Sequence, residues 1–242
     1  MKKIILLLSL LTFWLSAESA ENILRKIDAN RLSDGKIAVM TMTIRGRRGD
    51  RTISARVWQR NSKDSFTEYL SPAREKGTKM LKLGDQLWTY SPDTDRTILI
   101  SGHLLRQSVL GSDMSYEDML EDPYLLNTYT ASLIGEEILR ERPVWALDLT
   151  AKTADTAYAR RKLWVDKERY IALKEELYAQ SGRLLKLLEV SAVMQVNKRW
   201  LAKTMTYKDA LKDGDGTLVN IESLEFNDQL PEHLFSKAAL RK

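Results

Sequence analysis

The stretch that decides the fold reads Gly77-Thr78-Lys79-Met80-Leu81-Lys82-Leu83-Gly84-Asp85-Gln86-Leu87-Trp88-Thr89-Tyr90-Ser91-Pro92. Two short strand-like segments flank Gly84-Asp85, and this pattern predicts antiparallel strands joined by a tight turn. Another short strand over residues 96–100 leads into residues 102–121, where the β pattern stops. There, Ser115 precedes Tyr116-Glu117-Asp118, which is typical of a capped helix N-terminus with acidic residues in its first turn. The stretch therefore predicts a sheet that carries a helical lid.

The rest of the chain after residue 35 mostly continues the β pattern. Strands are expected over residues 36–45, 51–60, 64–70, 78–83, 86–91, 96–100, 129–138, 144–150, 159–165, 171–178, 184–194, 200–207 and 217–226. Helices are expected at residues 21–31 and 231–239. Meandering strands at this spacing predict a mainly β protein with one curved antiparallel sheet that is curled or partly closed. Residues 18–242 contain no repeat or flexible linker and are expected to form a single domain.

The N-terminal residues have the pattern of a secretory signal. Lys2 and Lys3 precede an apolar run over residues 4–15, and the small residues Ser16 and Ala17 follow. The run is too short for a permanent membrane-spanning helix. We therefore expect residues 1–17 to be a cleaved signal peptide and the mature chain to be soluble in a bacterial periplasm. The chain has no cysteine, which excludes disulfides, thiol catalysis and a lipidated cysteine.

The charge balance argues against a nucleic-acid partner. The formal net charge is +5, from 38 basic and 33 acidic residues. A nucleic-acid-binding protein gathers its basic residues along one face, and an exported protein does not meet nucleic acid. No nucleic-acid partner is expected.

Catalytic and metal-binding patterns are weak. The two histidines, His103 and His233, lie in no nucleophile or metal-binding motif. The carboxylates Asp113, Glu117 and Asp118 are explained by the positive end of a helix dipole, and carboxylates at consecutive helix positions point in different directions. We therefore expect no catalytic residue, no metal and no cofactor, and predict that the protein is not an enzyme.

Two further features each leave two interpretations open. Arg45, Arg47, Arg48 and Arg51 crowd one hairpin, either as solvated turn residues that discourage strand pairing or as a site for lipid phosphates or an acidic partner. The strand over residues 184–194 is largely apolar on both faces. Such a strand needs a cover on each face, which is either a packed helix or an apolar ligand cavity.

Residues 23–240 resemble the LolA-like outer-membrane lipoprotein-sorting family. The order and spacing of several motifs carry this resemblance: Gly77-Thr78-Lys79-Met80, Gly84-Asp85-Gln86-Leu87-Trp88-Thr89-Tyr90-Ser91-Pro92, Gly111-Ser112-Asp113-Met114-Ser115-Tyr116-Glu117-Asp118, Trp164-Val165-Asp166-Lys167-Glu168 and Leu230-Pro231-Glu232-His233-Leu234-Phe235. The resemblance implies a LolA/LolB-like half-open antiparallel β-barrel around an apolar cavity, with a helical lid or plug. It also implies that the protein ferries lipidated cargo across the periplasm.

The resemblance further implies a residue that locks the lid. In this family a Trp-x-x-Arg-Pro run places an arginine that binds helix carbonyls of the lid. The matching run here reads Trp58-Gln59-Arg60-Asn61, which makes Arg60 the candidate lock, one position early and without the proline. The longer lid region resembles the branch of the family associated with RND-type exporters, for which lipid rather than lipoprotein is the expected cargo.

These observations predict a monomeric periplasmic carrier that buries acyl chains of lipoproteins or lipids in a barrel cavity for transport towards the outer membrane. Its expected partners are a lipidated protein or lipid cargo. Amphipathic rings on one strand face and flexible methionines select the cavity candidates Trp58, Met80, Trp88 and Tyr90 and the lid candidates Met114, Tyr116 and Met119. The alternative is a module that docks on an inner-membrane transporter of the RND type and carries no cargo.

Overall fold

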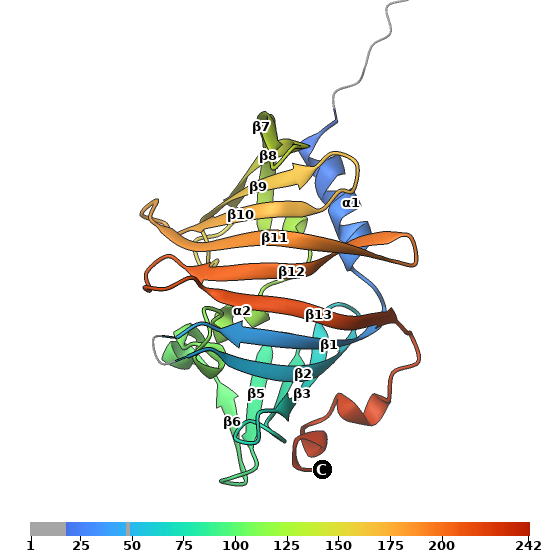
Figure 1. Ribbon diagram of the computed structural model, residues 1–242, viewed down its shortest axis with the longest axis vertical. Helices are drawn as coiled ribbons and strands as arrows, with labels where there is room; N and C mark the ends of the chain where they lie inside the picture. The colour runs from blue at the N-terminus through green and yellow to red at the C-terminus, as the bar shows by residue number, and fades with distance from the viewer. Residues whose placement is uncertain (1–17, 47–48) are drawn as a thin grey trace, which may run out of the picture.

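The computed structural model describes residues 18–46 and 49–242, so the expected signal peptide lies outside the described residues. Within these residues one antiparallel sheet of 13 strands dominates the fold (Figure 1). The strands are β1 (Gly35–Ile44), β2 (Arg51–Arg60), β3 (Asp64–Ser71), β4 (Lys79–Leu83), β5 (Gln86–Ser91), β6 (Arg96–Ile100), β7 (Tyr129–Leu139), β8 (Arg142–Ala151), β9 (Arg160–Asp166), β10 (Ala172–Tyr178), β11 (Leu184–Val196), β12 (Arg199–Asp209) and β13 (Thr217–Phe226). The predicted mainly β class is confirmed.

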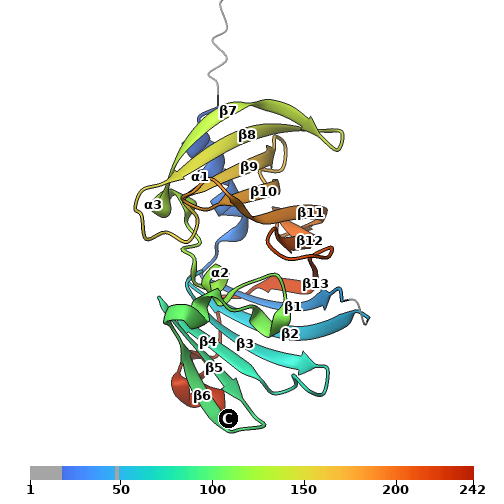
Figure 2. The same cartoon turned by 90° about the vertical axis from the view of Figure 1, so that its left-hand side faces the viewer.

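The strand order explains why the barrel stays half-open. It runs β6-β5-β4-β3-β2-β1-β13-β12-β11-β10-β9-β8-β7, with β1 paired to β13 in the middle. The edge strands β6 and β7 therefore lie at opposite ends of the sheet, although they follow each other in the chain. Residues 101–128 connect them, and Figure 2 shows this connection crossing the open side of the curved sheet.

We call residues 101–128 the lid segment. It contains the short helices η1 (Gly102–Arg106), η2 (Val109–Gly111), α2 (Tyr116–Leu120) and α3 (Leu125–Thr128). The predicted cap of α2 is present, since Ser115 accepts from the backbone of Asp118 and the Asp118 carboxylate accepts from the backbone of Ser115.

Helix α1 (Ala20–Arg31) packs against the inner face of one half of the curved sheet. Ser19 caps its N-terminus, and Ile23, Leu24 and Ile27 are buried, as the helical spacing of apolar residues predicts. These side chains pack against inward-facing residues of β8 and β9, including Leu147 and Leu163. Across the described residues no helix is long and apolar enough to cross a membrane.

The C-terminal segment covers the outer face of the other half of the sheet. The sequence predicts one helix at residues 231–239, whereas the structure has two short 3-10 helices, η3 (Glu232–Leu234) and η4 (Lys237–Arg241). The predicted single helix is wrong because Ser236 adopts an extended backbone, with φ −142° and ψ 151°. The break lets Leu240, which is fully buried, pack against Phe66 and Leu81.

Candidate functional site

An apolar cavity lies on the inner face of the sheet, between α1 and strands β10 to β13. Its volume is about 280 Å³, and we call it the apolar groove. Ile27 contributes from α1, Ile171 from the entrance to β10, and Ile221 from β13. Concave, mostly apolar cavities of roughly this size are typical sites for small ligands.

Two neighbouring strands supply the wall of the apolar groove. Leu188 on β11 pairs with Tyr207 on β12, and Val190 pairs with Met205. Paired residues project from the same face of a sheet, so these four side chains form one continuous surface. Burial raises the pKa of Tyr207 above its ordinary value, which keeps the phenol neutral. On this inner face β11 meets a cavity, and α1 forms the opposite wall of that cavity.

A second cavity of about 220 Å³ adjoins the apolar groove beneath the lid segment, and we call it the lid cavity. Leu188 and Tyr207 border both spaces. The lid cavity also reaches Met114 and the buried guanidinium of Arg161. Its lining is therefore partly apolar and partly charged.

A third cavity, of about 250 Å³, lies between the lid segment and strands β1 to β4. Its methionines are Met40 and Met42 from β1 and Met114 and Met119 from the lid segment. Lys82 also lines it, and burial lowers the pKa of this lysine. Met114 borders both this methionine cavity and the lid cavity, so the lid side chains join the two halves of the interior.

The middle of the lid segment is fixed to the sheet through Asp113, which is buried. Its carboxylate accepts from the Thr217 hydroxyl at 2.8 Å and from the Asp209 backbone N–H at 2.9 Å. Its backbone N–H donates to Thr217 Oγ1 at 2.9 Å, and Lys186 donates to its carbonyl oxygen. Every one of these contacts is structural, so Asp113 anchors the lid segment.

Side chains of β9 and the loop before it hold the part of the lid segment around α2. Tyr158 donates to the Asp118 carboxylate, and Arg161 forms an ion pair with Glu121. Arg161 is only 5% exposed. Burial raises the pKa of Glu121, although the guanidinium of Arg161 opposes this shift.

Met80 lies on the inner face with all three predicted lid residues. Met80 is 3% exposed and belongs to an apolar cluster in which Met42 is also buried. Met114, Tyr116 and Met119 pack against this cluster from the lid segment. The structure thus brings four of the predicted residues together.

The other three predicted cavity residues lie on the opposite face. Trp88 pairs with Leu81, whereas Met80 pairs with Thr89, so Trp88 and Met80 project from opposite sides of the sheet. Trp58, Trp88 and Tyr90 pack with the C-terminal segment instead of the lid segment. The expectation that these three residues line the cavity is therefore wrong, because the C-terminal residues cover the aromatic face of β5.

Arg60 also binds the C-terminal segment. Its guanidinium contacts Asp64 at 2.8 Å and Glu232 at 2.5 Å, and it lies 4.3 Å from the ring centre of Phe235. These contacts tie β2 to η3, and they replace the expected contact between Arg60 and the lid.

Two other arginines make the kind of contact expected of a lid lock. Arg51 on β2 donates to the carbonyl oxygen of Leu110, and Arg31 at the end of α1 donates to that of Pro123. Both acceptors belong to the lid segment. Sequence reasoning missed Arg31 because α1 and the lid segment are far apart in the chain.

The arginine-rich hairpin forms ion pairs at its two described positions. Arg45 lies 3.6 Å from Asp215, and Arg51 lies 3.4 Å from Glu75. Residues 47–48 lie outside the described residues. The described arginines therefore stabilise contacts within the protein.

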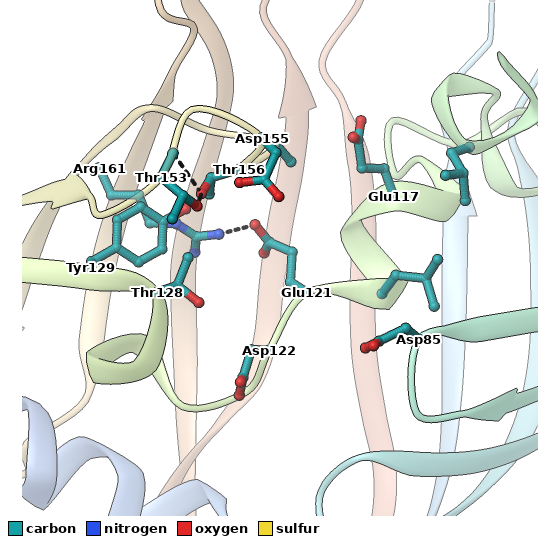
Figure 3. Close-up of a pocket in the computed structure, with 13 residues that line it drawn as sticks. Asp85, Glu117, Glu121, Asp122, Thr128, Tyr129, Thr153, Asp155, Thr156 and Arg161 are labelled. Carbon is teal, nitrogen blue, oxygen red and sulfur yellow. Dashed lines mark hydrogen bonds and ion pairs between the residues drawn. The ribbon is translucent and has the colours of Figure 1, made fainter. Parts of the chain in front are cut away.

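A polar cavity of about 380 Å³ opens where the lid segment crosses the open side of the curved sheet, and we call it the seam pocket. Figure 3 shows Asp155 and Tyr129 on one side, Glu117 and Asp85 on the other, and Glu121 between them. These residues come from the β4–β5 turn, the lid segment, β7 and the β8–β9 loop. Their wide separation in the chain left no local pattern for the sequence to show.

Neither histidine joins these cavities. His103 in η1 and His233 in η3 are both exposed. Among the described residues, no group of His, Cys, Asp or Glu side chains is arranged to hold a metal ion.

The comparisons agree with this architecture. A DUF1329 family protein from Desulfovibrio piger has a TM-score of 0.83 and 24% identity, over 91% of this chain and 97% of that one. A putative outer-membrane lipoprotein-sorting protein domain from Vibrio parahaemolyticus has a TM-score of 0.81 and 25% identity, over 93% and 98%. A LolA superfamily protein from Nitrosomonas europaea has a TM-score of 0.75 and 24% identity, over 91% and 99%.

No curated protein matches the chain. A family model matches residues 61–242, and its description is that of an uncharacterized protein. The resemblance predicted from the sequence is confirmed at the level of the fold. The chain therefore belongs to this family of uncharacterized proteins, and its fold is that of the outer-membrane lipoprotein-sorting and LolA superfamily proteins.

Proposed function

We propose that the protein is a non-enzymatic periplasmic carrier that binds the acyl chain of a lipid or lipoprotein in the apolar groove. The observation that carries this proposal is the groove of about 280 Å³ between α1 and strands β10 to β13, with its continuous wall of Leu188, Val190, Met205 and Tyr207. The structural neighbour from Vibrio parahaemolyticus, whose description names lipoprotein sorting, supports the same reading. In this proposal residues 1–17 direct export and residues 18–242 form one carrier domain.

The energetics favour a buried chain over a free one. Each methylene removed from water contributes roughly 0.8 kcal/mol, so a 12-carbon chain gains on the order of 10 kcal/mol before the costs of ordering. The lid cavity and the methionine cavity lengthen the available space beneath Met114. Thioether side chains adapt to irregular apolar ligands, which suits an interior that must fill and empty.

Native mass spectrometry of protein purified without detergent tests the proposal. A carrier is expected to retain lipid mass, and Val190→Trp is expected to abolish it because the larger ring fills the groove. Leu187→Trp is the matched control, since Leu187 projects from the opposite face of β11. A protein free of lipid that also fails to bind a fluorescent fatty acid would contradict the carrier function.

The second candidate is a docking module for an inner-membrane transporter of the RND type. The edge strands favour it, because Ile134 and Ile138 on β7 are 50% and 72% exposed and Ile98 on β6 is 47% exposed. Exposed apolar residues on an edge strand invite pairing with another chain. This candidate gains if the wild type binds no fatty acid and Ile134→Lys/Ile138→Lys abolishes transport in cells without lowering the melting temperature of the purified protein.

A further inference from the structure

The methionine cavity carries positive charge on its wall and no negative charge. Lys63 and Lys82 line it, and among the described residues that line it there is no aspartate or glutamate. The lid cavity differs, because four carboxylates line it: Asp118, Glu121, Asp122 and Glu175. By its charge, the methionine cavity is therefore suited to an anion.

The polar residues of the methionine cavity form one row across three neighbouring strands. Gln59 on β2 pairs with Ser65 on β3, and Ser65 pairs with Lys82 on β4. Paired residues project from the same face of a sheet, and Lys82 shares the inner face with Met80, two residues away on β4. An amide, a hydroxyl and an ammonium group therefore lie side by side on the inner face, and each can donate a hydrogen bond.

The other end of the methionine cavity is apolar. Met40 on β1 pairs with Ala55 on β2, and both line the cavity. Ala55 lies four residues from Gln59 on the same face, which is a separation of roughly 13 Å at about 3.3 Å per residue. Met114 and Met119 add thioethers from the lid segment. The cavity therefore offers donors at one end and an adaptable apolar surface at the other.

Lys82 is buried and has no carboxylate in contact. The residue is 9% exposed. Its Nζ donates to the carbonyl oxygen of Glu121 at 3.4 Å, which is longer than the usual range of about 2.7–3.2 Å. Within the described residues, no carboxylate lies within 4.0 Å of this ammonium group. A buried charge is costly unless it is paired, so the Lys82 ammonium group lacks the partner that it needs.

Four more distant carboxylates do not replace that partner. They are Asp64, Asp85, Glu121 and Asp122. Arg60 already binds Asp64, and Arg161 already binds Glu121. Burial lowers the pKa of Lys82 even though these four carboxylates oppose the shift. The charged form of Lys82 is therefore disfavoured, and an anion in contact with the ammonium group would favour it.

We propose that the methionine cavity binds an anionic amphiphile, whose carboxylate or phosphate accepts hydrogen bonds from Lys82, Gln59 and Ser65 and whose acyl chain lies against the methionines. Lys63, which is exposed in the β2–β3 turn, adds a second positive charge that attracts the anion. The methionine cavity shares no lining residue with the apolar groove. The assignment rests on the proposed carrier function only in that the ligand is an amphiphile, and it adds a second binding position and the sign of the head group.

Methyl NMR of protein labelled with 13C-methyl methionine tests the assignment, because the methionines report on separate sites. Met40 and Met42 line the methionine cavity, whereas Met205 lines the apolar groove. The probes share one tail: dodecanoate, dodecyl phosphate and dodecylamine, each below its micelle concentration. At least one of the two anions is expected to shift the Met40 and Met42 signals at about tenfold lower concentration than the amine, because charge-assisted bonds to the ammonium group form only with an anion. The comparison between the two anions then identifies the head group as carboxylate or phosphate.

Matched variants locate the effect. Lys63→Gln/Lys82→Gln is expected to remove most of the preference for the anion. Lys76→Gln/Lys203→Gln removes the same charge at exposed positions outside the cavity and should retain the preference. Lys82→Arg keeps the positive charge and should also retain it, and the melting temperature of each variant shows that the protein is folded.

Three results would contradict the assignment and leave the carrier function standing. The first is an equal response of Met40 and Met42 to the anions and the amine, and the second is a set of shifts confined to Met205. The third is an unchanged preference in folded Lys63→Gln/Lys82→Gln. If no probe shifts any of these three methionine signals, the carrier function is overturned and the assignment with it.

Discussion

Asp113 and Thr217 exchange two hydrogen bonds, with the Thr217 hydroxyl donating to the Asp113 carboxylate at 2.8 Å and accepting from its backbone N–H at 2.9 Å. Thr217 is fully buried at the start of β13, and Asp113 is 8% exposed. This pair fixes the lid segment to the centre of the sheet, where β13 meets the N-terminal half of the barrel.

Thr217→Val should destabilise the protein, because the isosteric change leaves a buried carboxylate oxygen and a backbone donor without partners. The expected loss is about 2–3 kcal/mol in the free energy of unfolding, measured by urea denaturation. Thr43→Val provides the control, since its hydroxyl bond to Thr52, at 3.0 Å, is exposed and should contribute under about 0.5 kcal/mol. Equal effects of the two variants would show that the Asp113 contact does not anchor the lid segment.

Lys36 should make stability depend on pH. Burial, together with the nearby Arg31 guanidinium, lowers the pKa of Lys36 from 10.5 to about 8. Between these values the unfolded chain binds more protons than the folded protein, so wild-type stability rises with pH. Relative to Lys36→Met, the wild type should gain on the order of 3 kcal/mol as the pH rises through this window. Urea denaturation of both proteins at pH 7 and pH 10 measures this, and a constant difference would contradict it.

Trp88→Ala should act on stability and leave ligand affinity unchanged. Trp88 is 5% exposed and packs with Phe66, Leu81 and Leu240 on the face away from the lid segment. Removing a buried tryptophan costs roughly 3–5 kcal/mol through lost burial and the cavity left behind. Thermal unfolding and fluorescent fatty-acid binding of the folded fraction measure the two effects. A selective loss of affinity with unchanged stability would restore Trp88 to the ligand site.

Met114→Ser/Met119→Ser should speed the release of a bound fatty acid. Both methionines line the methionine cavity and pack against the inner apolar cluster, yet both remain partly exposed. Their replacement weakens apolar cover of the interior and leaves the sheet pairing untouched, so the circular dichroism of the sheet should not change. Stopped-flow displacement of a fluorescent fatty acid measures the release rate. Release at the wild-type rate would show that these residues do not gate the site.

The strands were predictable because their determinants are local. The turn at Gly84-Asp85 and the alternation around it predicted β4 and β5, and the structure pairs Met80 with Thr89 across that turn. The cap of α2 was predictable for the same reason, since Ser115 and Asp118 are three residues apart.

The placement of side chains on the two faces was not predictable from local pattern. Trp88 and Met80 are both buried, because one face of the sheet is covered by the lid segment and the other by the C-terminal residues. Alternation shows that they lie on different faces but does not say which face is concave. The seam pocket was equally hidden, since Asp85, Glu117 and Asp155 meet only after the sheet has curled.

The position of β6 and β7 at opposite edges of one sheet gives the lid segment a mechanical role. Because residues 101–128 tether both edges, the length of this tether limits how far the sheet can uncurl. Lengthening or shortening this connection would change the width of the half-open barrel without altering a single strand pair. Insertions at this one connection would therefore change the size of the interior cavities while the sheet stays the same.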